Sequence, residues 1–250
     1  AQQVKKFKKQ FANLLFFNRF IKHASAIQCL SKKEFDETKI NINKFIGTNG
    51  MNIPVKSKSR FSINKVELIY IGRMDPYIKG LDLLIDGIKL YSEDFRSNNI
   101  RVSMYGQNYG NWHNNILNMI DKNNVKDLIE LHNGVMGKDK ENLLLNSDLF
   151  IQTSRSEGMP MGILEALSYG IPCIVTEGTN LGELIKKYDA GWVAGTNEKD
   201  IAQEIRQAIV QRDIWQKKSK NAIRLIKENF DWNKISQTTI QQYKKIIIKE

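Results

Sequence analysis

The chain has 250 residues, a mass of 28.9 kDa and a formal net charge of +11, with 41% hydrophobic and 26% charged residues. These values are typical of a globular protein with one large domain or two small ones, and no apolar run is long enough to span a bilayer. The first residues lack the apolar core of a secretory signal, and two isolated cysteines, Cys29 and Cys173, favour a reducing compartment, so we expect a cytoplasmic protein.

The positive charge is concentrated at the two ends of the chain. Residues 1–22 carry six cations and no anions, and residues 206–250 carry 11 cations and four anions. A nucleic-acid interface needs cations and aromatic side chains along one binding face. Because the middle of the chain is close to neutral, we expect no nucleic-acid partner.

The first 65 residues predict a short helical segment, a small β/α element and a linker. Residues 1–22 place Val4, Phe7, Phe11, Leu14, Leu15 and Ile21 at helical spacing. This helix either packs on a partner domain or rests with its basic face on anionic lipid. Residues 26–30 favour a short strand, Ser31 with Glu34 predicts a capping box for a helix to about Lys39, and residues 47–65 favour a linker.

From residue 66 onward, strands and helices alternate. Strands are expected at 66–71, 101–105, 129–132, 149–153, 170–176 and 191–193. Helices are expected at 80–95, 113–122, 138–146, after Pro160, 181–188, 198–211, 214–229 and 232–249. This alternation predicts an α/β fold with a doubly wound parallel sheet, in which ligands bind at the carboxyl ends of the strands. Those ends gather Gly72, Gly106, Gly134 and the segment Ser154–Gly162.

The segment Ser154–Leu167 carries the most information about function. It places Glu157 before a glycine-containing turn and Glu165 on the helix that follows, between two apolar strands. Such a turn aims free backbone N–H groups and a helix dipole at an anionic ligand. Two glutamates beside it favour a ligand with both phosphate and hydroxyl groups, such as a nucleotide sugar.

Two cations follow the first strand of this region. Arg73 and Lys79 could bracket a diphosphate, with Arg73 giving bidentate geometry. The alternative is that Arg73 pairs with Asp75 and that Lys79 is only solvated.

Two further interpretations concern the glutamates and the histidines. Glu157 and Glu165 could form a glycosidase pair, although no other acid lies near them in sequence, and Glu165 could simply pair within the fold. His23, His113 and His132 show no metal-ligand spacing, so we expect no metal cofactor.

Four stretches of this sequence resemble parts of the retaining family-4 glycosyltransferases of GT-B fold. The segment Tyr70–Leu84 (YIGRMDPYIKGLDLL) is similar to the strand-and-helix signature of that family, and Glu157 to Glu165 is similar to its E-x7-E motif. Asn49–Asn52 is similar to the interdomain linker, with Thr48 where proline is usual, and Phe230–Trp232 with Tyr243 resembles the final helix that crosses back to the N-terminal domain. The similarity covers roughly residues 25–248.

The resemblance implies a nucleotide-sugar donor, such as a UDP- or GDP-sugar, and no metal. It implies that Arg73 and Lys79 bind the diphosphate and stabilise the leaving group, that Glu157 lies by the transferred sugar, and that Glu165 bonds the ribose hydroxyls. Backbone groups would complete the donor site, from Gly72, Gly106, Val135, Gly158, Met159, Pro160, Met161, Gly162, Ile163 and Leu164.

Complete members of the family have an N-terminal acceptor domain of comparable size, and we expect residues 1–46 to be only the tail of that domain. We therefore expect a remnant and linker at 1–50, a Rossmann-like donor domain at 51–231, and a helix at 232–250 that crosses back. The expected function is sugar transfer, with retention, to a glycan or lipid-linked acceptor, by a fragment that is inactive alone. The alternative is a non-catalytic sugar-nucleotide or glycan-binding subunit. The two basic ends would form one face toward an anionic membrane surface, at its inner side.

Overall fold

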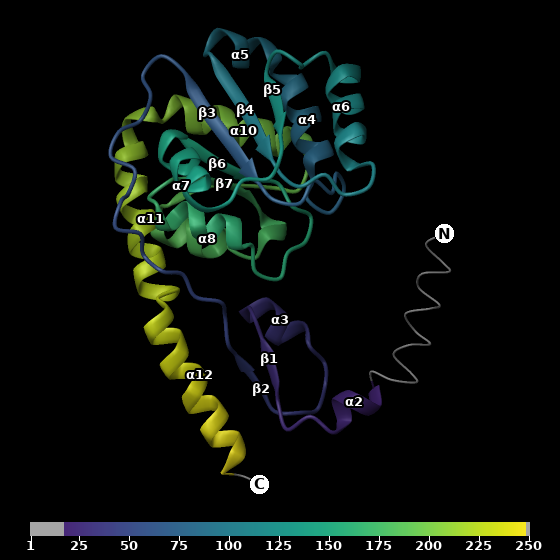
Figure 1. Cartoon of the computed structure of the whole chain (residues 1–250), viewed down its shortest axis with the longest axis vertical. Helices are drawn as coiled ribbons and strands as arrows, with labels where there is room; N and C mark the ends of the chain where they lie inside the picture. The colour runs from purple at the N-terminus through teal and green to yellow at the C-terminus, as the bar shows by residue number, and fades with distance from the viewer. Residues whose placement is uncertain (1–17, 249–250) are drawn as a thin grey trace. The chain divides into compact units, whose positions relative to one another are not determined.

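The computed structural model describes residues 18–248 and divides the chain into two compact units. The larger unit is Gly50–Trp232, and the smaller one joins the chain up to Asn49 with the chain from Asn233 onward (Figure 1).

The larger unit is built on a six-stranded parallel sheet of order β5-β4-β3-β6-β7-β8. The predicted α/β, doubly wound parallel fold is therefore confirmed. The strands are β3 (Val66–Ile71), β4 (Ile100–Tyr105), β5 (Ile129–His132), β6 (Leu149–Gln152), β7 (Cys173–Thr176) and β8 (Gly191–Ala194).

The direction of winding reverses between β3 and β6. From β3 the chain adds β4 and β5 on one side, then returns so that β6 pairs with the other side of β3, with Leu68 opposite Leu149. The strands are mostly apolar because helices cover both faces of the sheet. In such sheets ligands bind outside the carboxyl ends of the strands at this reversal point.

Two groups of helices enclose the sheet (Figure 1). One group packs α4 against α6 and α10, and the other packs α11 against α8 and α9. The helices are α4 (Leu81–Leu90), α5 (Ser92–Ser97), α6 (Trp112–Asn123), α7 (Gly137–Asn146), α8 (Met161–Ser168), α9 (Gly182–Tyr188), α10 (Glu198–Val210) and α11 (Trp215–Asn229), with short 3-10 turns η2 (Glu177–Thr179) and η3 (Arg212–Ile214).

The single helix expected at 80–95 is wrong, since two helices occupy this stretch. Tyr91 leaves the helical region, with φ −124° and ψ 29°, and separates α4 from α5. This change of direction lets Phe95 of α5 bury its ring in the core, where it is 1% exposed.

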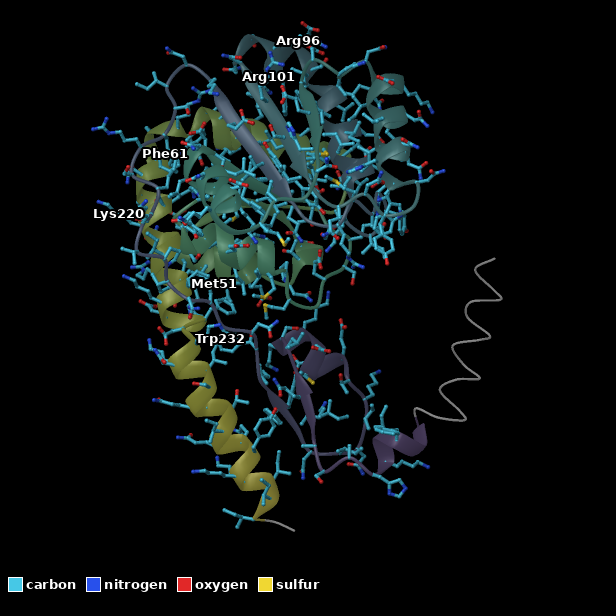
Figure 2. All side chains as sticks on the ribbon, in the orientation of Figure 1. Met51, Phe61, Arg96, Arg101, Lys220 and Trp232 are labelled. Atoms are coloured by element: carbon cyan, nitrogen blue, oxygen red, sulfur yellow. The ribbon has the colours of Figure 1, made fainter. Side chains whose placement is uncertain are left out.

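The two ends of the larger unit lie side by side. The N–H of Met51 donates to the carbonyl of Phe230 at 2.6 Å, and a parallel bridge joins Met51 to Asp231. Gly50 packs so closely on Trp232 that an added Cβ would lie 2.5 Å from the indole. Figure 2 labels the neighbouring Met51 and Trp232.

The smaller unit holds α2 (Asn18–Lys22), β1 (Ile27–Cys29), α3 (Lys32–Glu37), β2 (Lys44–Ile46) and most of α12 (Trp232–Ile247). Ser31 caps α3 as predicted, because its Oγ accepts from the N–H of Glu34, but the reciprocal bond of a capping box is replaced: Glu34 Oε2 accepts from the N–H of Leu30 at 2.6 Å. Helix α3 ends at Glu37, before the expected Lys39. Strand β2, which pairs in parallel with β1, was not expected from the sequence.

The amphipathic segment predicted at the start lies largely outside the described residues, which exclude Val4, Phe7, Phe11, Leu14 and Leu15. Among residues 18–248, no helix combines the length and the apolar character that a membrane crossing requires.

Candidate active site

The candidate site lies at the reversal point of the sheet, where the loop after β3 meets the loop after β6. The first loop carries Arg73 and Lys79, and the second carries Glu157. The N–H of Arg155 donates to the carbonyl of Ile78 at 3.0 Å, and this bond joins the two loops directly.

The carboxylate of Glu157 is the centre of a buried hydrogen-bond cluster. Its Oε1 accepts from Lys79 Nζ at 2.5 Å, from Ser154 Oγ at 2.6 Å and from Gln152 Nε2 at 2.8 Å. The side chains of Lys79 and Glu157 are each 11% exposed. A buried ion pair needs such additional donors, because desolvation opposes the attraction between the charges.

The backbone of Glu157 is fixed by the turn after β7. Its N–H donates to the carbonyl of Gly178 at 2.9 Å, and its own carbonyl accepts from Asn180 Nδ2. Glycine is required at 178 because an added Cβ would lie 2.5 Å from the carbonyl oxygen of Arg155. Three neighbouring strand ends, those of β3, β6 and β7, therefore set the position of one carboxylate.

The loop before α4 presents Lys79 from a tightly bonded turn. Asp75 Oδ1 accepts from the N–H groups of Tyr77 and Ile78, at 3.1 and 2.9 Å. Gly80 follows in the left-handed region with φ 63°, where its carbonyl accepts from Thr153 Oγ1 at 2.9 Å. These bonds direct the Lys79 side chain toward β6.

Arg73 lies on the same edge of the sheet. Tyr70 holds its backbone, because the phenol donates to the Arg73 carbonyl at 2.6 Å. Burial raises the pKa of Tyr70; the charge of Glu157 adds to this effect and that of Arg73 opposes it. The alternative pairing with Asp75 does not form, and the Arg73 side chain is exposed.

Glu165 faces a partner that the sequence did not suggest. In α8 its Oε2 lies 2.6 Å from Lys140 Nζ of α7, with the two side chains 28% and 26% exposed. The alternative that Glu165 pairs within the fold is thus realised. Both partners stay accessible enough to exchange this contact for a ligand.

The turn before α8 narrows the set of predicted backbone donors. The side chains of Ile163 and Leu164 are 0% exposed, and their N–H groups donate to the carbonyl of Pro160. Pro160 has no N–H. Of the predicted backbone donors on this turn, the N–H groups of Gly158 and Gly162 remain as candidates to serve a ligand, and the first turn of α8 adds its dipole.

Three further predicted residues, Gly72, Gly106 and Val135, follow β3, β4 and β5. The N–H of Gly72 donates to the Tyr105 carbonyl at 2.9 Å, and Gly106 lies against Gly72 so closely that a Cβ at 106 would meet its carbonyl oxygen. Val135 is half-buried in the loop after β5. Beside them the rings of Tyr105 and His132 stack with centroids 4.5 Å apart.

Three side chains at this site, Gln152, Asn180 and Lys140, were not expected from the sequence, and neither was the contact of Ser154 with Glu157. Only Gln152 leaves a signal in the sequence, since an amide at the end of the buried strand Leu149–Gln152 needs a polar partner. Within residues 18–248, no cluster of three or more histidine, cysteine, aspartate or glutamate side chains is arranged to hold a metal ion.

The sequence matches the family described as Glycosyl transferases group 1 over residues 54–227. The match covers more than half of the chain and includes every candidate site residue. The chain therefore belongs to this family of retaining family-4 glycosyltransferases, which have a GT-B-like fold.

Individual relatives support the same family. The chain is 28% identical over 178 residues to the O-antigen chain mannosyltransferase B of Escherichia coli, an alignment covering 70% of this chain and 45% of that protein. It is 30% identical over 106 residues to an N,N'-diacetylbacillosaminyl-diphospho-undecaprenol alpha-1,3-N-acetylgalactosaminyltransferase of Campylobacter jejuni, covering 42% of this chain and 28% of that protein.

A solved structure shares the fold. The structure of HepE from Anabaena in complex with UDP-glucose superposes with a TM-score of 0.75 at 17% identity, covering 89% of this chain and 64% of that one. The chain spans less than half of the length of the two curated relatives above.

Proposed function

We propose that this chain is the donor-binding part of a retaining glycosyltransferase that takes a sugar from a nucleoside diphosphate sugar. The observation that carries the proposal is the buried Lys79–Glu157 pair at the reversal point of the sheet, with Arg73 exposed on the same edge. A cation pair beside a helix N-terminus suits a diphosphate, and a fixed carboxylate suits sugar hydroxyls.

In this proposal the cations stabilise the charge that develops as the glycosidic bond breaks. The bond between the anomeric carbon and the diphosphate oxygen breaks, and the new bond to the acceptor oxygen forms on the same face of the sugar. The proton of the acceptor hydroxyl passes to the leaving diphosphate. The leaving diphosphate gains negative charge, which Arg73, Lys79 and the first turn of α8 would hold. Glu157 would orient the sugar hydroxyls, and Glu165 would bond the ribose.

The Lys79–Glu157 contact gives this site a means of responding to its ligand. An ammonium has three N–H donors, so Lys79 can add a phosphate oxygen while it keeps Glu157, or can move to the phosphate altogether. Glu157 keeps two neutral donors, Gln152 and Ser154, in either case. A bound diphosphate therefore leaves the carboxylate in place for the sugar.

The ligands and names of similar proteins support these ligand classes. HepE was solved with UDP-glucose, and the Campylobacter relative is named for a diphospho-undecaprenol acceptor. We extend the proposal to a UDP- or GDP-sugar donor and a glycan or lipid-linked acceptor, with the protein at the cytoplasmic face of an anionic membrane. Vesicle cosedimentation that is insensitive to anionic lipid and to salt contradicts the membrane part.

Calorimetric titration of the chain with UDP-, GDP- and ADP-sugars tests donor binding. We expect one nucleotide to bind, and Arg73→Ala and Glu165→Ala each to weaken it by about tenfold, the loss of one charge-assisted contact. Lys89→Ala and Glu183→Ala remove exposed charges elsewhere and serve as matched controls. Failure of all three nucleotides to bind, or unchanged affinity in both site variants, contradicts the proposal.

A further inference from the structure

A cavity lies at the edge of the sheet opposite the candidate active site, where the strands begin. It has a volume of about 540 Å³ and is lined by Lys56, Ser57, Lys58, Ser59, Arg60, Phe61, Ser62, Leu145 and Asn146. Its long wall, residues 56–62, precedes β3, and Figure 2 labels Phe61 in it. None of its residues belongs to the candidate active site.

Hydrogen bonds at three points hold this wall in place. The N–H of Lys58 donates to the Tyr169 carbonyl at 2.7 Å, and the N–H of Ser62 donates to Asp148 Oδ1 at 2.9 Å. Lys58 Nζ donates to the Leu145 carbonyl at 3.2 Å, at the C-terminal end of α7. The cavity is therefore bounded by fixed backbone.

The lining carries three cations and no carboxylate. Lys58 is partly balanced by Asp148, 3.5 Å from its Nζ, but both Asp148 oxygens also accept backbone N–H groups. Lys56 and Arg60 are exposed, and neither forms an ion pair within residues 18–248. Two positive charges at the rim thus have no counter-charge from the described part of the chain.

The same lining offers further donors for an anion. Ser57 and Ser59 are exposed hydroxyl groups between the cations, and Lys58 Nζ has a third N–H beyond the two contacts above. The helix dipole of α7 places partial negative charge at its C-terminal end, which disfavours an anion there. Lys58 reduces this effect because its Nζ donates to the carbonyl of Leu145 at that end. Phe61 and Leu145 add an apolar side to the cavity.

We propose that this cavity is a second anion site that binds a phosphate-bearing ligand, either a free phosphorylated molecule or the headgroup of an anionic lipid. Its volume lies within the range of roughly 300–1,000 Å³ that small-molecule sites occupy. In this proposal Lys56 and Arg60 contact the phosphate oxygens. The hydroxyl groups of Ser57 and Ser59 donate further hydrogen bonds to them, and the buried Lys58 lies at the inner end of the cavity.

Amide chemical shifts of the full chain test the proposal, with inorganic pyrophosphate as the free probe and phosphatidic acid vesicles as the lipid probe. We expect the amides of Ser57, Ser59 and Arg60 to shift with pyrophosphate. The double variant Lys56→Ala with Arg60→Ala should weaken this response by at least about tenfold, because two charge-assisted contacts are lost. Lys65→Ala is the matched control, since Lys65 is exposed on the same segment and does not line the cavity.

The two probes distinguish the sources. A response to pyrophosphate that depends on Lys56 and Arg60 supports a free ligand. Binding only to phosphatidic acid vesicles, with the same dependence and none to phosphatidylcholine vesicles, supports a lipid headgroup. Shifts confined to Gly72–Gly80 and Gly158–Gly162, an equal loss in Lys65→Ala, or no response to either probe overturns the proposal.

Discussion

At the scale of single residues, the site depends on how one carboxylate oxygen is held. Glu157 Oε1 accepts three hydrogen bonds, but only the bond from Lys79 comes from a group that a diphosphate attracts. Gln152 and Ser154 are 4% and 0% exposed, so packing fixes both donors. They are positioning residues, because in the proposed function they act on the sugar only through Glu157.

The first prediction concerns Gln152→Leu. Removing the amide takes away one bond to a charged acceptor, a loss of about 1.5 kcal/mol, and lets Glu157 turn toward Lys79. We expect affinity for the nucleotide sugar to fall by about tenfold and affinity for the matching nucleoside diphosphate to stay within about twofold. Calorimetry with the two ligands measures this difference.

A purely structural role for Gln152 leads to another result, namely equal weakening of both ligands. Gln216→Leu is the control, because Gln216 is exposed on α11 and lies outside the candidate site. A ratio of the two affinities that does not change in Gln152→Leu contradicts the positioning role.

At the scale of elements, Asp148 joins β6 to β3 and to the segment 56–62. The residue is 0% exposed and directly precedes β6. Its Oδ1 accepts from the N–H of Ser62 at 2.9 Å, its Oδ2 accepts from the N–H of Glu67 at 3.0 Å, and Lys58 supplies the counter-charge. Burial lowers the pKa of Lys58, and Asp148 opposes this effect.

We therefore predict that Asp148→Ala lowers the free energy of unfolding by about 3 kcal/mol. The variant leaves two backbone N–H groups without their acceptor and an ammonium buried without its counter-charge. Urea unfolding followed by circular dichroism measures the change. Asp121→Ala, which removes an exposed carboxylate from α6, should stay within about 0.5 kcal/mol. A loss below about 1 kcal/mol in Asp148→Ala contradicts the predicted role.

The elements themselves could largely be predicted from the sequence, and the exceptions have physical reasons. Strands such as Val66–Ile71 are rich in apolar and β-branched residues and are followed by glycine, so their pattern predicts a strand clearly. Strand β2 has only three residues, of which only Phe45 is buried, and it leaves no such pattern. The break at Tyr91 interrupts a helical pattern through one backbone conformation.

The sequence was sufficient to predict which strand ends carry the site residues. Arg73, Lys79 and Glu157 were expected on one edge because parallel strands end together there. The Lys79–Glu157 and Glu165–Lys140 pairs, and the clamp by Asn180, depend on loop geometry and side-chain rotamers. No spacing in the sequence encodes those contacts.

At the scale of the whole molecule, all candidate site residues fall within the unit Gly50–Trp232. The sheet of this unit buries two groups that ionise in alkali. Burial raises the pKa of the Cys173 thiol well above its usual value, and burial, assisted by the charge of Glu157, raises the pKa of Tyr70. The folded state therefore favours the neutral form of each group over its anion.

The last prediction is a loss of stability in alkali that belongs to this unit. Because both folded pKa values lie above the unfolded ones, the contribution is fully present at neutral pH. It is lost above about pH 8.5 for the thiol and above about pH 10 for the phenol. Each group should lower the unfolding free energy by about 1.4 kcal/mol per pH unit in its own range.

Denaturant unfolding measured from pH 7 to 11 gives the slope of the unfolding free energy against pH. We expect Tyr70→Phe to reduce this slope above pH 10 and Cys173→Val to reduce it from about pH 8.5. Tyr109→Phe removes an exposed phenol, 71% exposed, and should leave the slope as in the parent chain. Equal slopes in all four proteins contradict the assignment, because the alkaline loss then arises from other groups.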